Sequence, residues 1–256
     1  WGSVPYSEAF KLNDKVTYPA YDDLNVLYPA LMDELDAAIA LIDENEVAFS
    51  SGDVIYGGDA AAWKKFANSL KCRFAIRLSK VDTNWKTYIA EAVASGVFTS
   101  NADEAMFKYS TEAPNECYFY RGYFVDGRND FSISKPFADL LKGQRDTLNN
   151  KVHPWQGVKD PRLSIYTTPR GGKYNGIPYG LTSSQMAKYT INAFSPRWYQ
   201  APPAFLNKDF AVPLMTYAEL CFILSEYNNF DAAWYDKGVK ASISHWADLA
   251  GVELDA

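Results

Sequence analysis

Side chains that could carry acid–base or metal chemistry are few in this chain of 256 residues. Its two histidines, His153 and His245, have no cysteine or second histidine at the spacing that metal ligands use, and a proline follows His153. We therefore predict neither a metal site nor a nucleophilic triad at these positions. No motif in the sequence calls for a bound cofactor.

Glu219 and Glu226 are the most suggestive pair of carboxylates, because they share one face of a predicted helix. Seven residues at 1.5 Å each place them about 10.5 Å apart, beyond the roughly 5–9.5 Å that glycoside hydrolysis uses. A structural role is favoured. Arg77 lies beside the apolar stripe of another predicted helix, and a half-buried guanidinium needs a carboxylate, which Glu219 or Glu226 would supply. The protein is therefore predicted not to be an enzyme, with glycoside hydrolysis as a weaker alternative.

Other motifs also favour structure over chemistry. The glycine-rich segment 171–180 follows no hydrophobic strand, lacks the Gly-Lys-Ser/Thr of a phosphate loop, and contains Pro178 where a helix should start, so it is predicted to be a turn. The cysteines fit neither a disulfide framework nor a zinc site. Cys72 and Cys221 fall in helical patterns and are predicted to be buried.

Composition excludes several broad classes. With 48% apolar and 22% charged residues, the chain can bury a core. Its longest apolar run, 37–42, is far shorter than the roughly 20 residues of a membrane span. A net charge of −6 argues against nucleic acid as the main partner.

Helical periodicity occupies both ends of the chain, which predicts a mainly α fold. Predicted helices begin after caps at Asp22, Asp59 and Thr83, the last of them ending at Gly96. Shorter patterns predict helices over 135–141, 214–227 and 232–246. Lys64, Lys65, Lys71 and Lys80 are expected on a solvated face. Short connections between amphipathic helices predict antiparallel pairs, over about 22–96 and 213–248.

Between the helical pairs, residues of about 98–212 predict a loop-rich region with minor short β structure. Met106, Phe107, Tyr109 and the run 117–125 are expected to form short strands or ordered loop. Long loops within compact domains usually carry function. Eight aromatic residues lie between 153 and 200: Trp155, Tyr166, Tyr174, Tyr179, Tyr189, Phe194, Trp198 and Tyr199.

This aromatic segment is the predicted ligand site. Aromatic faces suit the C–H faces of sugar rings, and neighbouring amides and charges can bond hydroxyl groups. Ring stacking is assigned to Trp155, Trp198 and a tyrosine among Tyr174, Tyr179 and Tyr199, and hydrogen bonding to Asn175 and Arg197. The alternative is that most of these rings merely hold a long loop in place.

Several motifs in order resemble the SusD/RagB family of outer-membrane lipoproteins from Bacteroidetes-type bacteria. They are WGSVPYSEAF at 1–10, YGGDAAAWKKFANSLKCRFAIRLSKVD at 56–82, KDPRL at 159–163, PLMTYAELCFILSEY at 213–227 and WYDKGVKASISHW at 234–246. The resemblance implies paired tetratricopeptide-like helices with an irregular remainder that carries the ligand site. It also implies capture of oligosaccharides, or peptides in some relatives, and delivery to a SusC-like TonB-dependent transporter.

The same resemblance implies a cell-surface location through an acylated N-terminal cysteine. None of the three cysteines matches that position, so the signal and lipid anchor are expected outside this sequence. The chain is accordingly interpreted as a single SusD-like domain, 1–256, incomplete at both ends, with no other contact with the membrane. The alternative of another class is a helical-repeat module that docks a partner protein.

Overall fold

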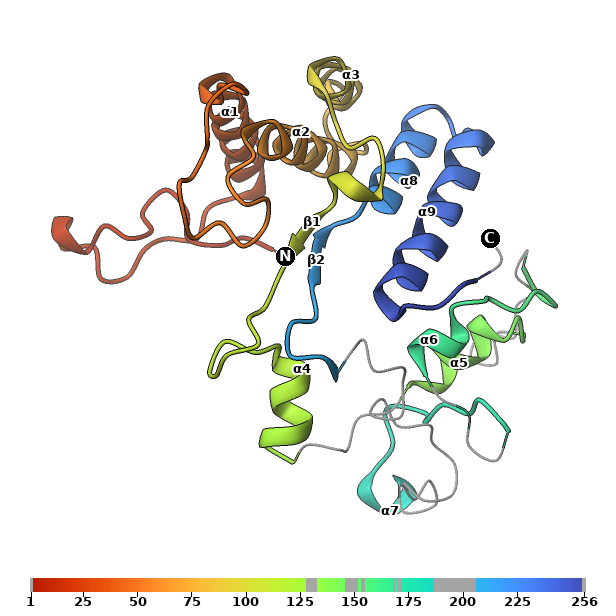
Figure 1. The fold of residues 1–256 in the computed structure, drawn as a ribbon. Coiled ribbons are helices and arrows are strands. Elements are labelled where there is room, and N and C mark those ends of the chain that lie inside the picture. Colours follow the sequence, from red (N-terminus) through yellow and green to blue (C-terminus); the bar gives the residue numbers. More distant parts are fainter. Residues whose placement is uncertain are drawn as a thin grey trace. The chain divides into compact units, whose positions relative to one another are not determined.

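The computed structural model describes residues 2–127, 133–145, 152, 155–167, 169, 172–186 and 206–254 (Figure 1). The chain divides into two compact units, Trp1–Ala105 with Met215–Tyr235 and Met106–Leu214 with Asp236–Ala256. Helices dominate. The described residues contain one small sheet, in which β1 (Ala105–Phe107) pairs with β2 (Val212–Met215). The predicted mainly α fold is confirmed.

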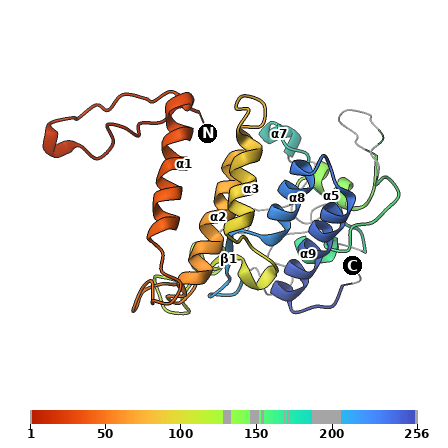
Figure 2. The same ribbon diagram turned by 90° about the horizontal axis from the view of Figure 1, so that it is seen from above.

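The first unit is built around α2 (Ala60–Arg77), which contacts α1 (Leu24–Leu41), α3 (Trp85–Ser95) and α8 (Tyr217–Tyr227). Figure 2 shows α1 and α3 running beside α2. One-turn 3₁₀ helices, η1 (Leu12–Asp14) and η2 (Asn101–Asp103), lie in the connecting segments.

The helix caps agree only partly with the sequence. Asp59 caps α2 by accepting the Ala62 N–H, and Gly96 ends α3 with a positive φ of 107°, both as predicted. At α1 the cap is Asp23, whereas Asp22 accepts backbone N–H groups of the preceding loop. At α3 the cap position is Asn84, so the prediction of Thr83 is wrong. A loop distant in the sequence competes for Asp22, which the local pattern does not reveal.

Lys71 shows how thoroughly α2 is enclosed. Its side chain is 4% exposed, and its Nζ lies 2.7 Å from Asp36 of α1 and 3.0 Å from Glu91 of α3. The prediction of a solvated face is therefore wrong for Lys71. Helices on more than one side of α2 leave few of its faces open, so a buried ammonium is neutralised by two carboxylates.

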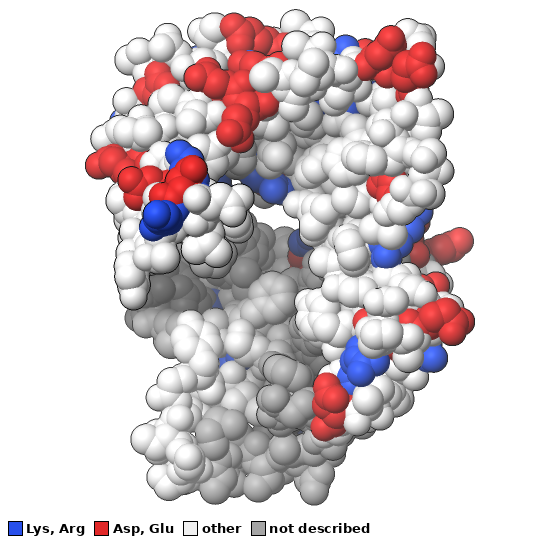
Figure 3. All heavy atoms as spheres, turned by 90° about the vertical axis from the view of Figure 1, so that its left-hand side faces the viewer, with Lys and Arg blue, Asp and Glu red and all other residues white. Residues whose placement is uncertain are grey.

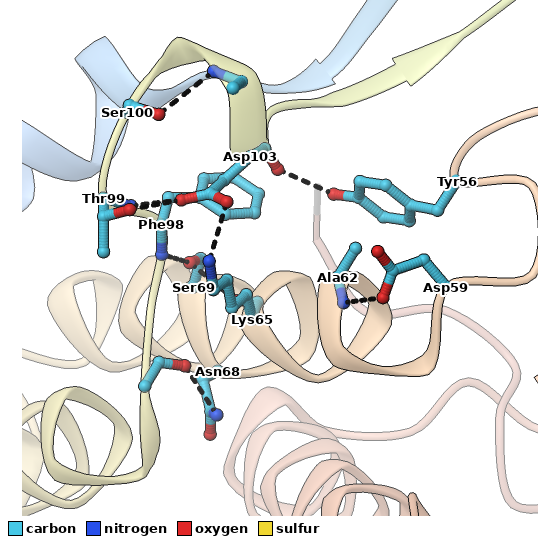
Figure 4. Close-up of polar contacts among 12 residues, drawn as sticks. Tyr56, Asp59, Ala62, Lys65, Asn68, Ser69, Phe98, Thr99, Ser100 and Asp103 are labelled. Carbon is cyan, nitrogen blue, oxygen red and sulfur yellow. Dashed lines mark hydrogen bonds and ion pairs between the residues drawn. The ribbon is translucent and has the colours of Figure 1, made fainter. Parts of the chain in front are cut away.

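The segment after α3 is held on α2 by polar contacts (Figure 4). Asp103 accepts from Lys65 Nζ at 2.8 Å and from the Thr99 N–H at 2.6 Å. One turn along α2, Ser69 Oγ accepts the Phe98 N–H at 3.0 Å, and Asn68 donates to the Gly96 carbonyl at 2.8 Å. These bonds satisfy polar groups that burial would otherwise leave unpaired.

Arg73 connects α2 to α8. Its Nε and Nη2 each lie 2.6 Å from a carboxylate oxygen of Glu219, a bidentate pair across 146 residues of sequence. The predicted link between the two helices exists, but its arginine is Arg73. Arg77, one turn further along α2, is exposed.

Near the C-terminal end of the chain, α8 belongs to the first unit, and α9 (Ala232–Ala250) begins in the first unit and continues into the second. α8 begins at Tyr217, later than predicted, because Val212–Met215 pairs as a strand and Thr216 then caps the helix. After a short turn comes α9, longer than predicted at its C-terminal end. The second unit also contains α4 (Tyr118–Tyr120) with the π-turn η3 (Arg121–Val125), α5 (Lys135–Leu141), α6 (Leu163–Tyr166) and α7 (Ser183–Met186).

The run 117–125 is therefore helical, and its prediction as strand or ordered loop is wrong. Cys117 is fully buried and its N–H is bonded to the Lys208 carbonyl at 2.6 Å, which anchors the start of the turn. Tyr120 and Phe124, four residues apart, have ring centroids 5.0 Å apart. Such an i, i+4 contact stabilises a helix.

The ion pair between α2 and α8 gives a direct test. In a double-mutant cycle, Arg73→Ala and Glu219→Ala should couple by about 1 kcal/mol in the free energy of unfolding, because the pair is bidentate but partly exposed. Urea denaturation measures it. The cycle of Arg77→Ala with Glu219→Ala serves as the control and should couple within error of zero; a coupling confined to Arg77 would contradict the structure.

Candidate functional site

The loop that bears Trp155 is fixed to the C-terminal end of α5. The Gly157 N–H donates to the Gly143 carbonyl at 2.8 Å, and the Asp160 N–H donates to the Leu141 carbonyl at 2.8 Å. The turn is closed by a bond of 2.9 Å from the Val158 N–H to the Trp155 carbonyl. Backbone bonds thus fix the position from which the indole projects.

The loop that bears Tyr174 and Tyr179 is fixed to the other end of α5. Ile177 accepts the Lys135 N–H at 2.8 Å and donates its own N–H to the Ile133 carbonyl at 2.9 Å. Because α5 has seven residues, the two anchoring points are about 10 Å apart along its axis. A pair of aromatic loops is thereby spaced by one short helix.

Glycines permit the close approach of both loops to α5. Gly143 has φ of +67°, and a Cβ added to it would overlap the backbone of Val158. A Cβ on Gly176 would overlap the backbone of Ser134. Only glycine allows these backbones to lie so close.

Arg162, in the KDPRL motif at 159–163, makes a set of hydrogen bonds that we call the clasp of the Trp155 loop. Arg162 donates to both carboxylate oxygens of Asp160, at 2.9 and 2.5 Å, and its Nη1 donates to Ser242 Oγ of α9 at 2.6 Å. Burial alone would raise the pKa of Asp160, but the hydrogen bonds from Arg162 hold that pKa below its ordinary value. The hydrogen bond to Asp160 in turn raises the pKa of Arg162. The clasp joins the loop to α9 within the second unit.

The predicted site residues differ in exposure. Trp155 is 45% and Tyr179 69% exposed, so both side chains are accessible at the surface. Asn175 is half-buried. Tyr174 is also half-buried: it packs against the cluster of Ile133, Ala138, Leu141 and Leu163, with Lys159 Nζ 5.6 Å from its ring centroid. Arg197, Trp198 and Tyr199 lie outside the described residues.

Two of the residues considered in the sequence for catalytic chemistry take part in packing or ion pairing. Glu219 is held by Arg73, and His245 is buried with its ring 5.1 Å from that of Trp246. His153 lies outside the described residues. Within the described ranges, no cluster of His, Cys, Asp and Glu could hold a metal ion. The helices of those ranges also include none with the length and apolar character of a membrane span.

Two further exposed aromatic side chains, on α4 and η3, are not singled out by the sequence pattern. Tyr118 and Phe124 are 54% and 57% exposed there. The signal was present as the dense aromatic run at 118–124, which the sequence reading treated as strand or loop. Helical winding, and not alternation, decides which of its rings face outward.

The described residues thus combine a mainly α frame with exposed aromatic rings on anchored loops. The family model described as "Starch-binding associating with outer membrane", SusD-like_2, matches residues 1–255. The chain belongs to this SusD-like family, and the resemblance seen in the sequence is confirmed. Glycan binding and association with the outer membrane are the properties that the family description carries.

Solved structures of SusD-like proteins match the fold of this chain. A SusD homolog from Bacteroides uniformis is 27% identical, with a TM-score of 0.74 over 99% of this chain and 50% of its own. A SusD-like protein from Bacteroides thetaiotaomicron is 25% identical, with a TM-score of 0.71 over 99% and 50%. The fold also matches a chitin-binding protein, 24% identical, with a TM-score of 0.74 over 100% and 54%. The chain thus spans about half the length of these relatives. No curated protein matches it significantly.

The glycine at the end of α5 can be tested by substitution. Gly143→Ala should lower the free energy of unfolding by about 2 kcal/mol or more, because it adds a backbone clash to the cost of a positive φ. Gly180→Ala is the matched control: its φ is +76°, but its Cβ would meet no described atom within 4 Å, so it should cost only about 1 kcal/mol. Equal losses in urea denaturation would contradict the described packing.

Proposed function

We propose that this chain is the non-catalytic glycan-binding part of a cell-surface nutrient-uptake protein. The observation that carries the proposal is the pair of exposed rings, Trp155 and Tyr179, on loops bonded to opposite ends of α5. In a family described as starch-binding, two fixed ring faces suit two sugar residues of one oligosaccharide. The rings are already placed before the ligand arrives, so little ordering entropy opposes binding.

Polar groups beside the rings would bond the sugar hydroxyls. Asn175 lies between Tyr174 and Tyr179 in the same loop, and Arg197, Trp198 and Tyr199 stay in the proposed site as predicted from the sequence. The loop-rich region of about 98–212 would thus carry the ligand, framed by the helical pairs at about 22–96 and 213–248.

The net negative charge of the chain favours an uncharged ligand over an anionic one. The chain carries 31 acidic and 25 basic residues, and Figure 3 shows a face on which acidic side chains form several groups with fewer basic ones. A polyanionic glycan would be repelled by such a surface. Neutral oligosaccharide is therefore favoured, and peptide is the alternative ligand.

The proposal includes delivery of the ligand to a SusC-like TonB-dependent transporter, with a lipid anchor outside this sequence holding the protein at the outer membrane. The family description, which places starch binding together with the outer membrane, supports this arrangement. The helical pairs offer a rigid surface for such a partner, and a helical-repeat interaction role is compatible with ligand binding in the loops.

Titration calorimetry with maltoheptaose and chitohexaose tests the ligand site. Trp155→Ala and Tyr179→Ala should each weaken binding about fivefold, because each stacked ring contributes about 1 kcal/mol. Tyr18→Ala is the matched control, since this tyrosine is 93% exposed but lies in the first unit, so its substitution should leave affinity unchanged. Unchanged affinity in both loop variants would refute the stacking assignment, and binding of peptides in place of both sugars would favour the alternative ligand.

Co-purification tests the partner. In the full-length protein, Trp155→Ala with Tyr179→Ala should still retain the SusC-like transporter, because the proposed docking uses the helices and not the aromatic loops. Loss of the transporter together with the ligand would instead make these loops part of the protein interface.

A further inference from the structure

The two aromatic loops on α5 also contact each other, within the second unit. Lys159 follows Trp155 in the first loop, and its Nζ lies over the ring of Tyr174 in the other loop, 5.6 Å from the ring centroid. An ammonium within about 6 Å of a ring centroid is attracted by the negative charge of the π face. We call this contact between Lys159 and Tyr174 the cross-brace.

The backbone that carries Lys159 is held in place. The next residue, Asp160, donates its N–H to the Leu141 carbonyl at 2.8 Å, and Arg162 donates to both oxygens of the Asp160 carboxylate. The Lys159 side chain therefore extends from a fixed point at the C-terminal end of α5. Only its rotamers stay open, and attraction to a ring selects among them.

Tyr174 offers less surface to a ligand than Tyr179 does. It is half-buried against the apolar cluster of α5, and the Lys159 ammonium lies over its ring. Tyr179 is 69% exposed. Because a stacked sugar needs a free ring face, Tyr179 fits the role of ligand ring and Tyr174 fits the role of support.

The cross-brace gives the second loop another fixed point. Hydrogen bonds of Ile177 hold this loop at the N-terminal end of α5, and a segment held at one point can pivot about it. Tyr174, three residues earlier, is held through its ring. Two fixed points set the direction of the segment between them, which contains Asn175, and of Tyr179 just beyond it.

We propose that Lys159 and Tyr174 are positioning residues of the ligand site, whose contact holds the loop of Asn175 and Tyr179 in one orientation to Trp155. The inference rests on the proposed glycan-binding function and changes the role of Tyr174 in it from stacking ring to support. A site held ready in this way loses less entropy on binding. The benefit reaches only ligands long enough to engage both loops, because a single sugar residue engages one ring.

The dependence of affinity on ligand length tests this role in the full-length protein. Lys159→Met removes the ammonium but keeps an unbranched side chain, and it should weaken the binding of maltoheptaose or chitohexaose about threefold in calorimetry. Binding of the single sugars glucose and N-acetylglucosamine, followed by NMR titration, should stay unchanged. Lys159→Arg keeps a cation for the ring and should bind all four sugars as the unaltered protein does.

Variants of Tyr174 test the other side of the contact. Tyr174→Phe keeps the ring and should retain the affinity for the oligosaccharides, whereas Tyr174→Leu should weaken it about threefold. Lys159→Met combined with Tyr174→Leu should weaken it no more than Tyr174→Leu alone, because both changes remove the same contact. Independent effects, about ninefold together, would overturn the cross-brace.

Hydrogen exchange tests the cross-brace without any ligand. In the ligand-free protein, Lys159→Met should speed the exchange of the backbone amides of 174–180 about threefold, and Lys159→Arg should not, because the segment then pivots more often about its single remaining anchor. Lys240→Met, at an exposed lysine of α9 in the same unit, is the matched control and should change neither exchange nor affinity.

The outcomes separate this inference from the proposed function. If Trp155→Ala and Tyr179→Ala weaken binding while Lys159→Met and Tyr174→Leu do not, the proposed function stands and the positioning role is refuted. Equal weakening of single sugars and oligosaccharides by Lys159→Met would make Lys159 a ligand contact and also refute that role. If the unaltered protein binds no sugar, the proposed function fails, and the exchange measurement alone decides whether the cross-brace holds the loop.

Discussion

The enclosure of α2 is the constraint on which the first unit depends. A helix covered by α1, α3 and α8 must pair every polar group that it carries inward, because an unpaired buried charge costs several kcal/mol. Lys71 is met by acids from two helices, and Arg73 by Glu219 of a third. These pairs specify which helices become neighbours, since a wrong neighbour would leave a cation without its carboxylate. The frame is thereby fixed by charge as well as by apolar packing.

The second unit depends on a different constraint, because many of its described residues lie outside helices and strands. Backbone bonds to both ends of α5, two glycines that allow close approach, and the clasp of Arg162 on Asp160 and Ser242 hold these connections in place. Loops fixed in this way can present aromatic rings in a defined arrangement.

The aromatic residues fall into two groups, those whose rings pack against other rings inside a unit and those whose rings stay exposed. Trp63 and Phe66 of α2 contact each other and belong to the first unit's interior, whereas Trp155, Tyr179 and Phe124 keep large exposed faces. In the proposed function, the exposed rings of the loop-rich region would meet the apolar faces of sugars.

The sequence by itself determined most of the long helices, the Asp59 cap, the Gly96 stop and the family, because each depends on local spacing or on motif order. It did not determine that Arg73 and not Arg77 meets Glu219, that Lys71 is buried, or that 118–125 winds into a helix. Nor could it separate the half-buried Tyr174 from the exposed Tyr179 in one loop. These features depend on partners up to 146 residues away, and burial, not local pattern, decides which of them prevails.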